Sequence, residues 1–468
     1  MSDQASNPGS AKVLEDLIGE ILSFRGTIRD LPVSPEVHAT EIREYLHAHF
    51  DLHSPTSLDA VFGEVVSMFR RWHLHVTHPR YFGLFNPSVT LGSIVGDTLA
   101  ALYNPQLAVW SHSPVANEIE TLTLSFLMQF LGFDPSTAGA NFTSGGAEAN
   151  FSATVVALGE RLPGFLQHGA QGRRPRIYVS SEAHHSFHKT AAMAGIGAEA
   201  VRTIPVDDRL QMRVDLLEDQ VRTDREAGDE PVMVVATAGT TSAGSVDPIE
   251  TLTRSCENTR LWLHVDAAWG GSALLVPSLR PLFAGIDRSD SITWDAHKWL
   301  SVPMGAGMVF YRDREAAART FAVATAYMPS SEEGTLDPYG STVQWSRRTI
   351  GLKLFVSLAT LGATGYQQMI LRQIEMCDRL RKGLARHGWT ILYDSPLAVV
   401  CFTHDRIREV SSERTFARQI QKRGVAWISS TVLGGSTPAL RACVTSHLTD
   451  ENDIDTLLLA LEQELARI

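Results

Sequence analysis

The sequence predicts an α/β protein with a large, mostly parallel β-sheet, preceded by a helical segment and followed by a smaller α+β unit. Between about residues 141 and 313, short and evenly apolar segments alternate with stretches of helical periodicity, as is typical of parallel strands covered on both faces. Only helical patterns precede this region, and strands and helices are segregated after about residue 361. Together these observations indicate one main sheet domain flanked by two structurally different segments.

The composition is that of an ordinary globular protein with room for a sizeable core. The chain has 468 residues, of which 44% are hydrophobic and 20% charged, enough for two or three domains. Its formal net charge is −11, and it has no sustained basic stripe. We therefore expect neither nucleic acid nor an anionic membrane surface as a partner.

Cysteine usage and the lack of targeting patterns predict a cytoplasmic protein. Cys256, Cys377, Cys401 and Cys443 share no CxxC or CxH spacing, so reduced thiols are expected rather than disulfides or a zinc site. Residues 1–10 are polar and lack the apolar core of a secretory signal. No uncharged apolar run reaches the roughly 18 residues that a transmembrane helix needs.

The first helical pattern spans residues 11–24, where apolar residues recur at helical spacing on one wide face. Pro32 and Pro35 end it, and a second helix is expected over residues 36–50. Two helices ahead of any strand suggest that residues 1–77 form an arm, which packs on another surface such as a partner subunit.

A turn-rich aromatic segment, residues 78–87, follows this arm, and helices are expected at residues 91–103 and 117–131. Two prolines and a glycine make the aromatic segment unsuited to a core element. Its side chains either pack the loop or form the wall of a substrate pocket. The candidate pocket residues are Phe82, Leu84, Phe85, Asn86 and Gln106.

Apolar runs in the central region are expected to form strands of the main sheet. These runs are residues 176–180, 232–238, 261–267, 291–294 and 307–311. In open parallel sheets, ligands bind at the carboxyl ends of the strands, and the polar motifs of this chain fall at those positions.

The C-terminal part is expected to form the smaller α+β unit. Its predicted helices are residues 366–386, 414–424 and 453–465. Its predicted strands are residues 389–392, 398–403, 425–428 and 439–445.

Residues 143–150, Thr-Ser-Gly-Gly-Ala-Glu-Ala-Asn, open a helix that runs to about residue 162. Small residues at a helix N-terminus leave backbone N–H groups bare, which suits a phosphate but also occurs where packing is merely tight. The segment is not a P-loop, because no Lys-Ser/Thr pair follows.

Two further polar motifs follow expected strands. In residues 181–188, His184 and His188 could bind zinc with a third ligand such as Glu182. Alternatively, His184 could lie flat against a planar cofactor or cap a helix. Residues 238–248 form a hydroxyl-rich turn that suits either a ligand or a capped loop.

Asp266 and Lys298 follow two other expected strands. An unpaired carboxylate at Asp266 would cost several kcal/mol, so it requires either a protein cation or a protonated ring nitrogen of a ligand. Ala268, two residues on, is small enough to let a flat ring lie on the sheet. Lys298, beside His297, either extends to solvent or serves as an amine that loses its proton and forms a Schiff base.

A phosphate-binding turn, a strand-end histidine, a strand-end aspartate and a strand-end lysine, in this order, resemble a pyridoxal-phosphate enzyme. More narrowly, Asp-Ala-Ala-Trp (266–269) with Asp-Ala-His-Lys-Trp (295–299) resembles the group II amino-acid decarboxylases. The resemblance implies an aspartate-aminotransferase-like (fold type I) architecture with a sheet of the seven-stranded type. It also implies an N-terminal helical arm for dimerisation (1–77), a large cofactor-binding domain (78–360) and a small C-terminal domain (361–468).

The resemblance also implies roles for individual residues. Lys298 would hold the cofactor as an internal aldimine, and His297 would contact its phosphate. Asp266 would pair with the pyridinium nitrogen, so that the ring can accept the electron pair of a bond broken at Cα. His184 and Ala268 would lie on opposite faces of the ring. The remaining predicted contacts are Gly146 and Ala147 with the phosphate, and Thr241 and Asp247 with the ring edge.

The sequence also predicts the surroundings of the Lys298 amine and of the cofactor phosphate. Burial among Trp294, Trp299 and Leu300 should favour the neutral amine of Lys298. Asp295 stands where others of the family often carry Asn, and an acid near a phosphate is repulsive unless it is paired. Asp295 is therefore left out of the phosphate contacts.

Residues 326–348 are polar and rich in Pro and Gly, which predicts a mobile active-site lid. In the family, a tyrosine on such a loop donates the proton to Cα after CO2 leaves, and a phenylalanine there accompanies aldehyde-forming chemistry. Tyr339 is the best match, and Tyr327 is the alternative.

The activity implied is decarboxylation of an L-amino acid to an amine and CO2, with pyridoxal 5'-phosphate as cofactor, no metal, and a homodimeric assembly. The candidate pocket segment does not match the aromatic-substrate enzymes closely, so the substrate class stays open. Alternatives are an aldehyde synthase or another amino-acid lyase on the same fold, and a cofactor-free binding protein.

Overall fold

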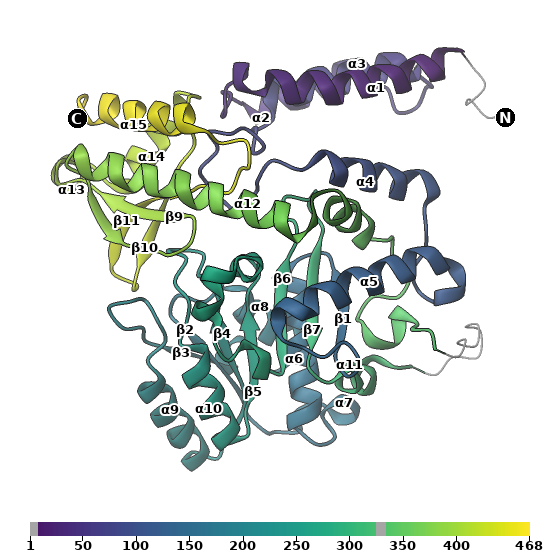
Figure 1. Ribbon diagram of the computed structural model, residues 1–468, viewed down its shortest axis with the longest axis vertical. Helices are drawn as coiled ribbons and strands as arrows, with labels where there is room; N and C mark the ends of the chain where they lie inside the picture. Colours follow the sequence, from purple (N-terminus) through teal and green to yellow (C-terminus); the bar gives the residue numbers. More distant parts are fainter. Residues whose placement is uncertain (1–7, 324–333) are drawn as a thin grey trace.

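The computed structural model describes residues 8–323 and 334–468, which form two β-sheets of different size (Figure 1). The larger sheet has seven strands in the order β1-β7-β6-β5-β4-β2-β3. Their bounds are β1 (Gly139–Thr143), β2 (Pro175–Ser180), β3 (Val201–Ile204), β4 (Glu230–Thr237), β5 (Trp262–Asp266), β6 (Ser291–Asp295) and β7 (Gly307–Tyr311). β2 to β6 run parallel, and β7 is antiparallel to both neighbours, β1 and β6. The predicted large, mostly parallel sheet is confirmed.

All the expected strands of this sheet are present, and β1 and β3, which were not expected, complete it. β1 has the polar sequence Gly-Ala-Asn-Phe-Thr, and β3 is the four-residue edge strand Val-Arg-Thr-Ile. Both lie at the edges of the sheet, where less of the strand is buried. Neither therefore needs the continuous apolar run that marks a central parallel strand.

Both faces of the larger sheet are covered, which explains the evenly apolar strands. In β2, Ile177 and Val179 belong to one hydrophobic cluster, and Tyr178 between them belongs to the other. β4 divides in the same way, with Met233 and Val234 in different clusters. Since successive side chains of a strand point to opposite faces, each cluster fills one side of the sheet.

Helices form the outer layers on these two sides. On the side of Ile177 lie α6 (Gly146–Arg161), α8 (Ser186–Met193) and α11 (Arg314–Phe321), with the short α7 (Phe165–His168) directly after α6. On the side of Tyr178, in front of the sheet in Figure 1, lie α5 (Pro114–Leu131), α9 (Val214–Glu226) and α10 (Ile249–Thr259).

The helices that precede α5 in the sequence are α1 (Pro8–Thr27), α2 (Ala39–His49), α3 (Leu58–Trp72) and α4 (Leu91–Tyr103). α3 was not expected, although Ser57 caps it by accepting a hydrogen bond from the backbone of Ala60. α1 and α3 lie side by side at one end of the molecule (Figure 1), where Arg70 donates to both carboxylate oxygens of Glu20 at 2.9 and 2.8 Å. In the described part of the chain, no helix has the length and apolar character needed to cross a membrane.

The smaller sheet is antiparallel and C-terminal, in the order β10-β11-β9-β8. Its strands are β8 (Thr390–Tyr393), β9 (Val399–Thr403), β10 (Ser429–Leu433) and β11 (Thr437–Cys443). The helices beside it are α13 (Asp405–Val410), α14 (Glu413–Lys422) and α15 (Glu451–Leu465). The predicted smaller α+β unit is confirmed.

The strand expected at residues 425–428 is wrong. The strand that pairs with β11 begins only at Ser429, and Trp427 forms just an isolated bridge to Tyr81. Ala426 and Ile428 are completely buried, so the apolar character of this segment reflects core packing. The true strand, Ser-Ser-Thr-Val-Leu, is a more polar edge strand.

α12 (Gly351–Arg386) is longer than expected and links the two sheets. It is interrupted at Gly362, whose φ of 64° lies in the left-handed region that favours glycine. Its first part packs on α4 and α5, and its second part reaches α15 and β8. We propose that the division between the large and small domains, expected at residue 361, falls at this interruption.

The start of α12 is held by one buried acid, Glu120 of α5. Its Oε1 accepts the backbone N–H groups of Ile350 and Gly351 at 2.8 and 2.9 Å and the hydroxyl of Thr349 at 3.0 Å. Its Oε2 accepts a hydrogen bond from Arg347 at 2.7 Å, and both side chains of this ion pair are almost fully buried. Glu120 thus caps the helix that connects the two sheets.

We expect Glu120→Ala to destabilise the protein by about 3 kcal/mol or more, because it leaves the Arg347 charge and the N–H groups of α12 buried without a partner. Urea unfolding followed by circular dichroism measures this change. The control, Asp219→Ala, removes an exposed carboxylate that pairs with Arg222, and should cost less than about 1 kcal/mol. Equal effects of the two substitutions would contradict the capping role.

Candidate active site

The carboxyl ends of β1, β2, β4, β5 and β6 meet at one edge of the larger sheet, because these strands all point the same way. Gly307 of β7 pairs with Thr143 at the end of β1 and with Asp295 at the end of β6. A Cβ atom on Gly307 would lie 2.5 Å from the hydroxyl of Thr143 and 2.6 Å from the Cα of Gly145. Glycine at this position therefore brings the turn after β1 close to the end of β6.

That turn and the N-terminus of α6 form a cradle of small residues. A Cβ atom on Gly146 would lie 2.9 Å from Asp295 Oδ2 and 3.4 Å from the methyl group of Ala268. The first N–H groups of the helix, at Gly146 and Ala147, have no partner within the helix. Bare N–H groups at the positive end of a helix dipole fit a phosphate group.

Asp266, at the end of β5, is a buried carboxylate whose partners are neutral. Its Oδ2 accepts a hydrogen bond from the side-chain amide of Asn150 at 3.0 Å, and its Oδ1 accepts one from the backbone of Ala268 at 3.1 Å. Within residues 8–323 and 334–468, Asp266 forms no ion pair, although it is only 6% exposed. Such a site fits a cationic ligand group, and the protonated ring nitrogen of pyridoxal phosphate is one.

Lys298 lies just past the end of β6, and its amine contacts a second buried acid. Its Nζ is 3.2 Å from Asp295 Oδ2, and its side chain is 24% exposed. Asp295 Oδ1 has no hydrogen-bond partner among the described residues. The neighbourhood of the amine is therefore a carboxylate rather than the apolar enclosure expected from Trp294, Trp299 and Leu300.

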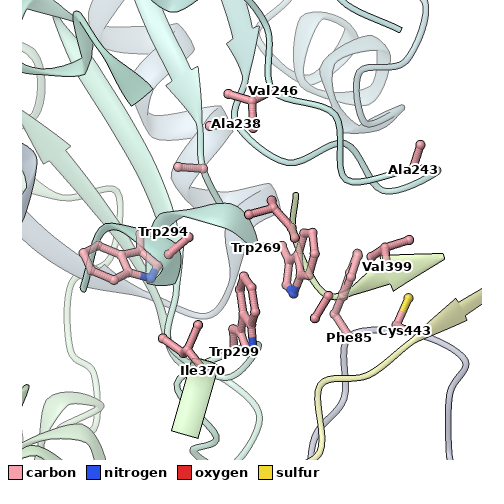
Figure 2. Close-up of a cluster of buried hydrophobic side chains, with 14 of the residues drawn as sticks. Phe85, Ala238, Ala243, Val246, Trp269, Trp294, Trp299, Ile370, Val399 and Cys443 are labelled. Carbon is pink, nitrogen blue, oxygen red and sulfur yellow. The ribbon is translucent and has the colours of Figure 1, made fainter. Parts of the chain in front are cut away.

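Trp299, next to Lys298 in the sequence, instead belongs to a buried aromatic stack. The rings of Trp269 and Trp299 are stacked at 4.8 Å, and Phe85 stacks on Trp269 at 4.3 Å (Figure 2). Trp299 also donates a hydrogen bond to Gln373 of α12 at 2.5 Å. This buried aromatic stack joins the loop that carries Lys298 to the second part of α12.

His297 and His184 flank the same acids. Burial lowers the pKa of His297 from its ordinary 6.5, while Asp295 raises it and Lys298 lowers it further. Its Nδ1 accepts the N–H of Ala306 at 3.2 Å, which leaves Nε2 facing Asp295 at 3.7 Å. Both the geometry and the lowered pKa describe a neutral imidazole at pH 7.

His184 follows β2, and Asp266, Lys298 and Asp295 are among the charges that act on it. Burial is the largest influence and lowers its pKa, although part of the ring remains exposed. Its Nδ1 accepts the N–H of Ser186 at 3.2 Å, so Nε2 is left for another contact. The structure thus brings His184 together with Asp266 and Lys298.

The zinc alternative finds no support in the described part of the chain, which contains no group of three or more His, Cys, Asp or Glu side chains suited to a metal ion. Glu182, the suggested third ligand, instead accepts hydrogen bonds from Ser242 and from the backbone of Gly434 at 2.7 Å. It connects the main sheet to the hairpin between β10 and β11.

Thr241 and Asp247, both predicted at the ring edge, lie in different environments. Thr241 is exposed on the turn after β4. Asp247 is completely buried, and its carboxylate oxygens accept the backbone N–H groups of Thr237 and Met212 at 2.7 Å each. Since backbone groups occupy both oxygens, we expect Asp247 to stabilise this turn rather than to contact a cofactor directly.

The candidate pocket residues do not form one wall. Phe82 is fully buried and Phe85 belongs to the aromatic stack, so both have packing roles, whereas Leu84 is exposed. Asn86 lies within 3.3 Å of the sulfur of Met304. Gln106 is tied to Ser346 and His112 by hydrogen bonds of 3.0 and 2.8 Å. A substrate contact from any of them stays a prediction.

Tyr339 lies in a short helical turn, Pro338–Ser341, on the segment expected to form the lid. Its backbone N–H donates to Ala108 at 3.1 Å, and its ring packs on Trp345. These contacts involve neither Lys298 nor Asp266. The alternative residue, Tyr327, is outside the described residues.

Sequence reasoning missed two residues of this region. Asn150 was part of the predicted phosphate motif but was given no role, because only the fold reveals that it faces Asp266. Arg441 of β11 is 2% exposed, and its guanidinium lies 4.7 Å from the ring centre of Phe85. It donates to the backbone oxygen of Gly83 at 2.7 Å, while its Nε and Nη2 have no hydrogen-bond partner among the described residues.

Comparison with known proteins agrees with this arrangement. Residues 43–405 match the model of the pyridoxal-dependent decarboxylase conserved domain. The chain is 28% identical over 400 residues to the aromatic-L-amino-acid decarboxylase of Bacillus atrophaeus, covering 83% of this chain and 81% of that protein. It is also 28% identical over 410 residues to the human acidic amino acid decarboxylase GADL1, covering 83% and 78% of the two chains.

Solved structures resemble this protein over almost the whole length of the chain. The crystal structure of Oryza sativa TDC with PLP and tryptamine has a TM-score of 0.93 and 25% identity, covering 100% of this chain and 99% of that one. Mouse CSAD has a TM-score of 0.91 and 26% identity, covering 98% and 99%. These similarities include proteins named for aromatic and for acidic substrates.

The buried carboxyl of Asp247 should make stability depend on pH. Burial raises its pKa from 3.8 to about 7 and outweighs the two backbone N–H donors, which lower the pKa, so the fold favours the neutral form. The resulting stabilisation is complete below pH 4 and is lost as the pH rises through 7. In Asp247→Asn this loss should be absent, so the stability of the wild type relative to the variant should fall by about 2 kcal/mol between pH 5 and 7.

Urea midpoints of both proteins, measured from pH 5 to pH 8, test this expectation. Placing an asparagine amide beside two backbone donors also costs stability, but this cost does not depend on pH. It therefore does not affect the comparison, which uses only the change of stability with pH. If the difference in urea midpoint between the wild type and Asp247→Asn does not change with pH, Asp247 is already ionised in the folded protein.

Proposed function

The chain belongs to the pyridoxal-dependent decarboxylase family, which makes pyridoxal phosphate its cofactor and amino-acid decarboxylation its reaction, and on that premise we propose roles for the residues at the active-site edge. The substrate is an L-amino acid, and the products are its amine and CO2. The assignment of residues rests on two buried acids at the ends of neighbouring strands. Asp295 contacts the amine of Lys298, whereas Asp266 forms no ion pair among the described residues.

When bound, the cofactor supplies an aldehyde that condenses with amines and a ring that accepts the electron pair released at Cα. Gly146 and Ala147 offer their N–H groups to its phosphate at the start of α6. Asp266 would hold a proton on the ring nitrogen, because it forms no ion pair with any described residue. Ala268 and His184 would bound the space on either side of the ring.

Lys298 provides the amine that bonds the cofactor, and Asp295 accepts the proton that this amine must lose. Support comes from the 3.2 Å contact between Lys298 Nζ and Asp295 Oδ2 and from the unpartnered second oxygen of Asp295. His184, neutral at pH 7 because of its lowered pKa, keeps Nε2 free beside these groups. The proton needed at Cα after CO2 leaves comes from Tyr339 or from Lys298.

Arg441 is the proposed anchor for a carboxylate of the substrate. A buried guanidinium with two unpartnered nitrogen atoms is costly unless an anion completes its contacts. A carboxylate that is retained in the product suits this position better than the one that leaves, because binding the departing group tightly would stabilise the ground state. This reasoning favours testing acidic amino acids alongside aromatic ones.

The assembly we propose is a homodimer that uses the N-terminal helices. Leu14, Ile18 and Leu22 are each at least 60% exposed and recur every four residues along one face of α1. Leu91 and Val95 add a similar exposed pair on α4. Apolar faces of this kind are typical of subunit interfaces. A cytoplasmic location is proposed as well, supported by cysteines that are all free and buried.

Lys298→Ala should abolish the visible absorbance band that the wild type shows with pyridoxal phosphate, and its sensitivity to borohydride, because the covalent link is lost. Amine formation should fall by at least about a thousandfold. Lys382→Ala, on the exposed face of α12, is the control and should retain both properties. A band that persists in Lys298→Ala would disprove the lysine assignment.

The substrate and the reaction are tested together with a panel of acidic, aromatic and other L-amino acids. One CO2 per amine, with neither ammonia nor hydrogen peroxide, is the expected stoichiometry. Ammonia together with an aldehyde would instead indicate an aldehyde synthase. A protein that binds no pyridoxal phosphate would contradict the proposed use of all these residues.

Ile18→Glu combined with Leu22→Glu should convert the proposed dimer to a monomer, because two charges would be buried in an apolar interface. Light scattering after size-exclusion chromatography measures the mass. The control is Val410→Glu, which changes an exposed residue of α13, outside the N-terminal arm, and should leave the dimer intact. A wild-type mass near 51.3 kDa would itself contradict the dimer.

A further inference from the structure

A series of hydrogen-bonded, buried polar side chains leads to Asp266. It begins at the indole of Trp262, at the start of β5, and ends at the carboxylate of Asp266, at the end of the same strand. The members between them are Ser291, His264 and Asn150, with Thr293 as a side branch. All six are at most 6% exposed.

Each link has hydrogen-bond geometry. Trp262 Nε1 donates to Ser291 Oγ at 2.8 Å, and Ser291 Oγ lies 2.9 Å from His264 Nδ1. On the other side of the ring, His264 Nε2 lies 3.1 Å from Asn150 Oδ1. Asn150 Nδ2 then donates to Asp266 Oδ2 at 3.0 Å. The chain therefore has no gap between the indole and the carboxylate.

The orientation of these hydrogen bonds is set at the carboxylate end, because a carboxylate can only accept. The NH2 group of Asn150 therefore faces Asp266 and its Oδ1 faces His264, and Ser291, which accepts from Trp262, still has its own proton for His264 Nδ1. Burial lowers the pKa of His264 to about 4, so at pH 7 the ring carries a single proton, which lies on Nε2. That proton points at Asn150 Oδ1. The hydroxyl of Thr293 donates to the same oxygen at 2.7 Å.

Two donors on its oxygen leave Asn150 only one orientation, with its NH2 group facing Asp266. An amide turned the other way would place its oxygen against the carboxylate and its NH2 group against two donors. Asp266 consequently meets an N–H from Asn150 on Oδ2 and an N–H from Ala268 on Oδ1. Donors to both oxygens stabilise the ionised carboxylate and fix its plane.

We propose that Asn150 is a positioning residue for the cofactor: held by Trp262, Ser291, His264 and Thr293, it keeps Asp266 an ionised acceptor aimed at the ring nitrogen of pyridoxal phosphate. The inference rests on the role of Asp266 proposed above. A lysine or arginine in place of Asn150 would also have satisfied the acid, but its charge would have competed with the pyridinium. The neutral chain fixes Asp266 and leaves its charge for the cofactor.

The test compares pyridoxal phosphate with its 1-deaza analogue, in which CH replaces the ring nitrogen. Both are titrated into cofactor-free protein, and binding is followed by absorbance and by tryptophan fluorescence. Asn150→Leu should weaken binding of pyridoxal phosphate about tenfold or more, yet change binding of the analogue less than about twofold. Asn150→Asp, which keeps the size and can accept from His264 and Thr293, should lose at least as much.

Two substitutions of His264 test the part of the hydrogen-bond series that lies beyond Asn150. His264→Leu removes the donor to Asn150 and should show the same cofactor-dependent loss. His264→Gln, whose amide can donate to Asn150, should recover most of the affinity. Should an Asn150 or His264 variant fail to fold, as judged by circular dichroism, Ser291→Ala provides the same comparison with a smaller expected loss of about threefold.

Equal losses with both cofactors would overturn the proposal, because Asn150 would then act on folding or packing alone. Asp266→Asn separates this result from failure of the underlying assignment. If it does not reduce the difference in affinity between pyridoxal phosphate and the analogue, Asp266 is not the partner of the ring nitrogen. If Asp266→Asn reduces this difference in affinity but the Asn150 and His264 variants leave it unchanged, only the positioning role of Asn150 is disproved.

Discussion

The architecture of this site depends on a buried carboxylate, Asp266, that forms no ion pair with the part of the chain that the structure describes. Asp266 sits at the end of a central strand covered on both faces, where an isolated charge is expensive. The remainder of the site is built to make that charge tolerable and useful. Neighbouring strands end at the same edge, glycines let the turn after β1 approach, and a neutral amide fixes the carboxylate plane. In the proposed function, the ring nitrogen of the cofactor is the cation that pairs with Asp266.

Three buried acids lie at the ends of neighbouring strands or in the turn after one, and each has a different kind of partner. Asp266 accepts neutral N–H groups, Asp295 contacts the amine of Lys298, and Asp247 accepts two backbone N–H groups. Their chemistry follows from these partners rather than from the residue type. An acid with neutral donors can bind an external cation, an acid beside an amine can take its proton, and an acid enclosed by backbone is structural.

The sequence allowed most of the elements to be predicted, and it placed Asp266 and Lys298 at strand ends, because continuous apolar strands and the motifs around these two residues are local signals. The strand Gly307–Tyr311 and the helix Leu91–Tyr103 were predicted with their observed bounds. What could not be predicted depends on contacts between distant segments. The contact of Asn150 with Asp266 spans 116 residues, and the packing of residues 425–428 against the core imitated the pattern of a strand.

The position of β7 has a consequence for how the protein is made. β1 pairs only with β7, and β7 lies between β1 and β6, so the turn after β1 has no neighbour in the sheet until Gly307–Tyr311 has been synthesised. The phosphate cradle is thus encoded early in the chain but closed late, by a pairing of high contact order. During synthesis, residues 139–143 therefore stay without their only strand partner until residues 307–311 have left the ribosome.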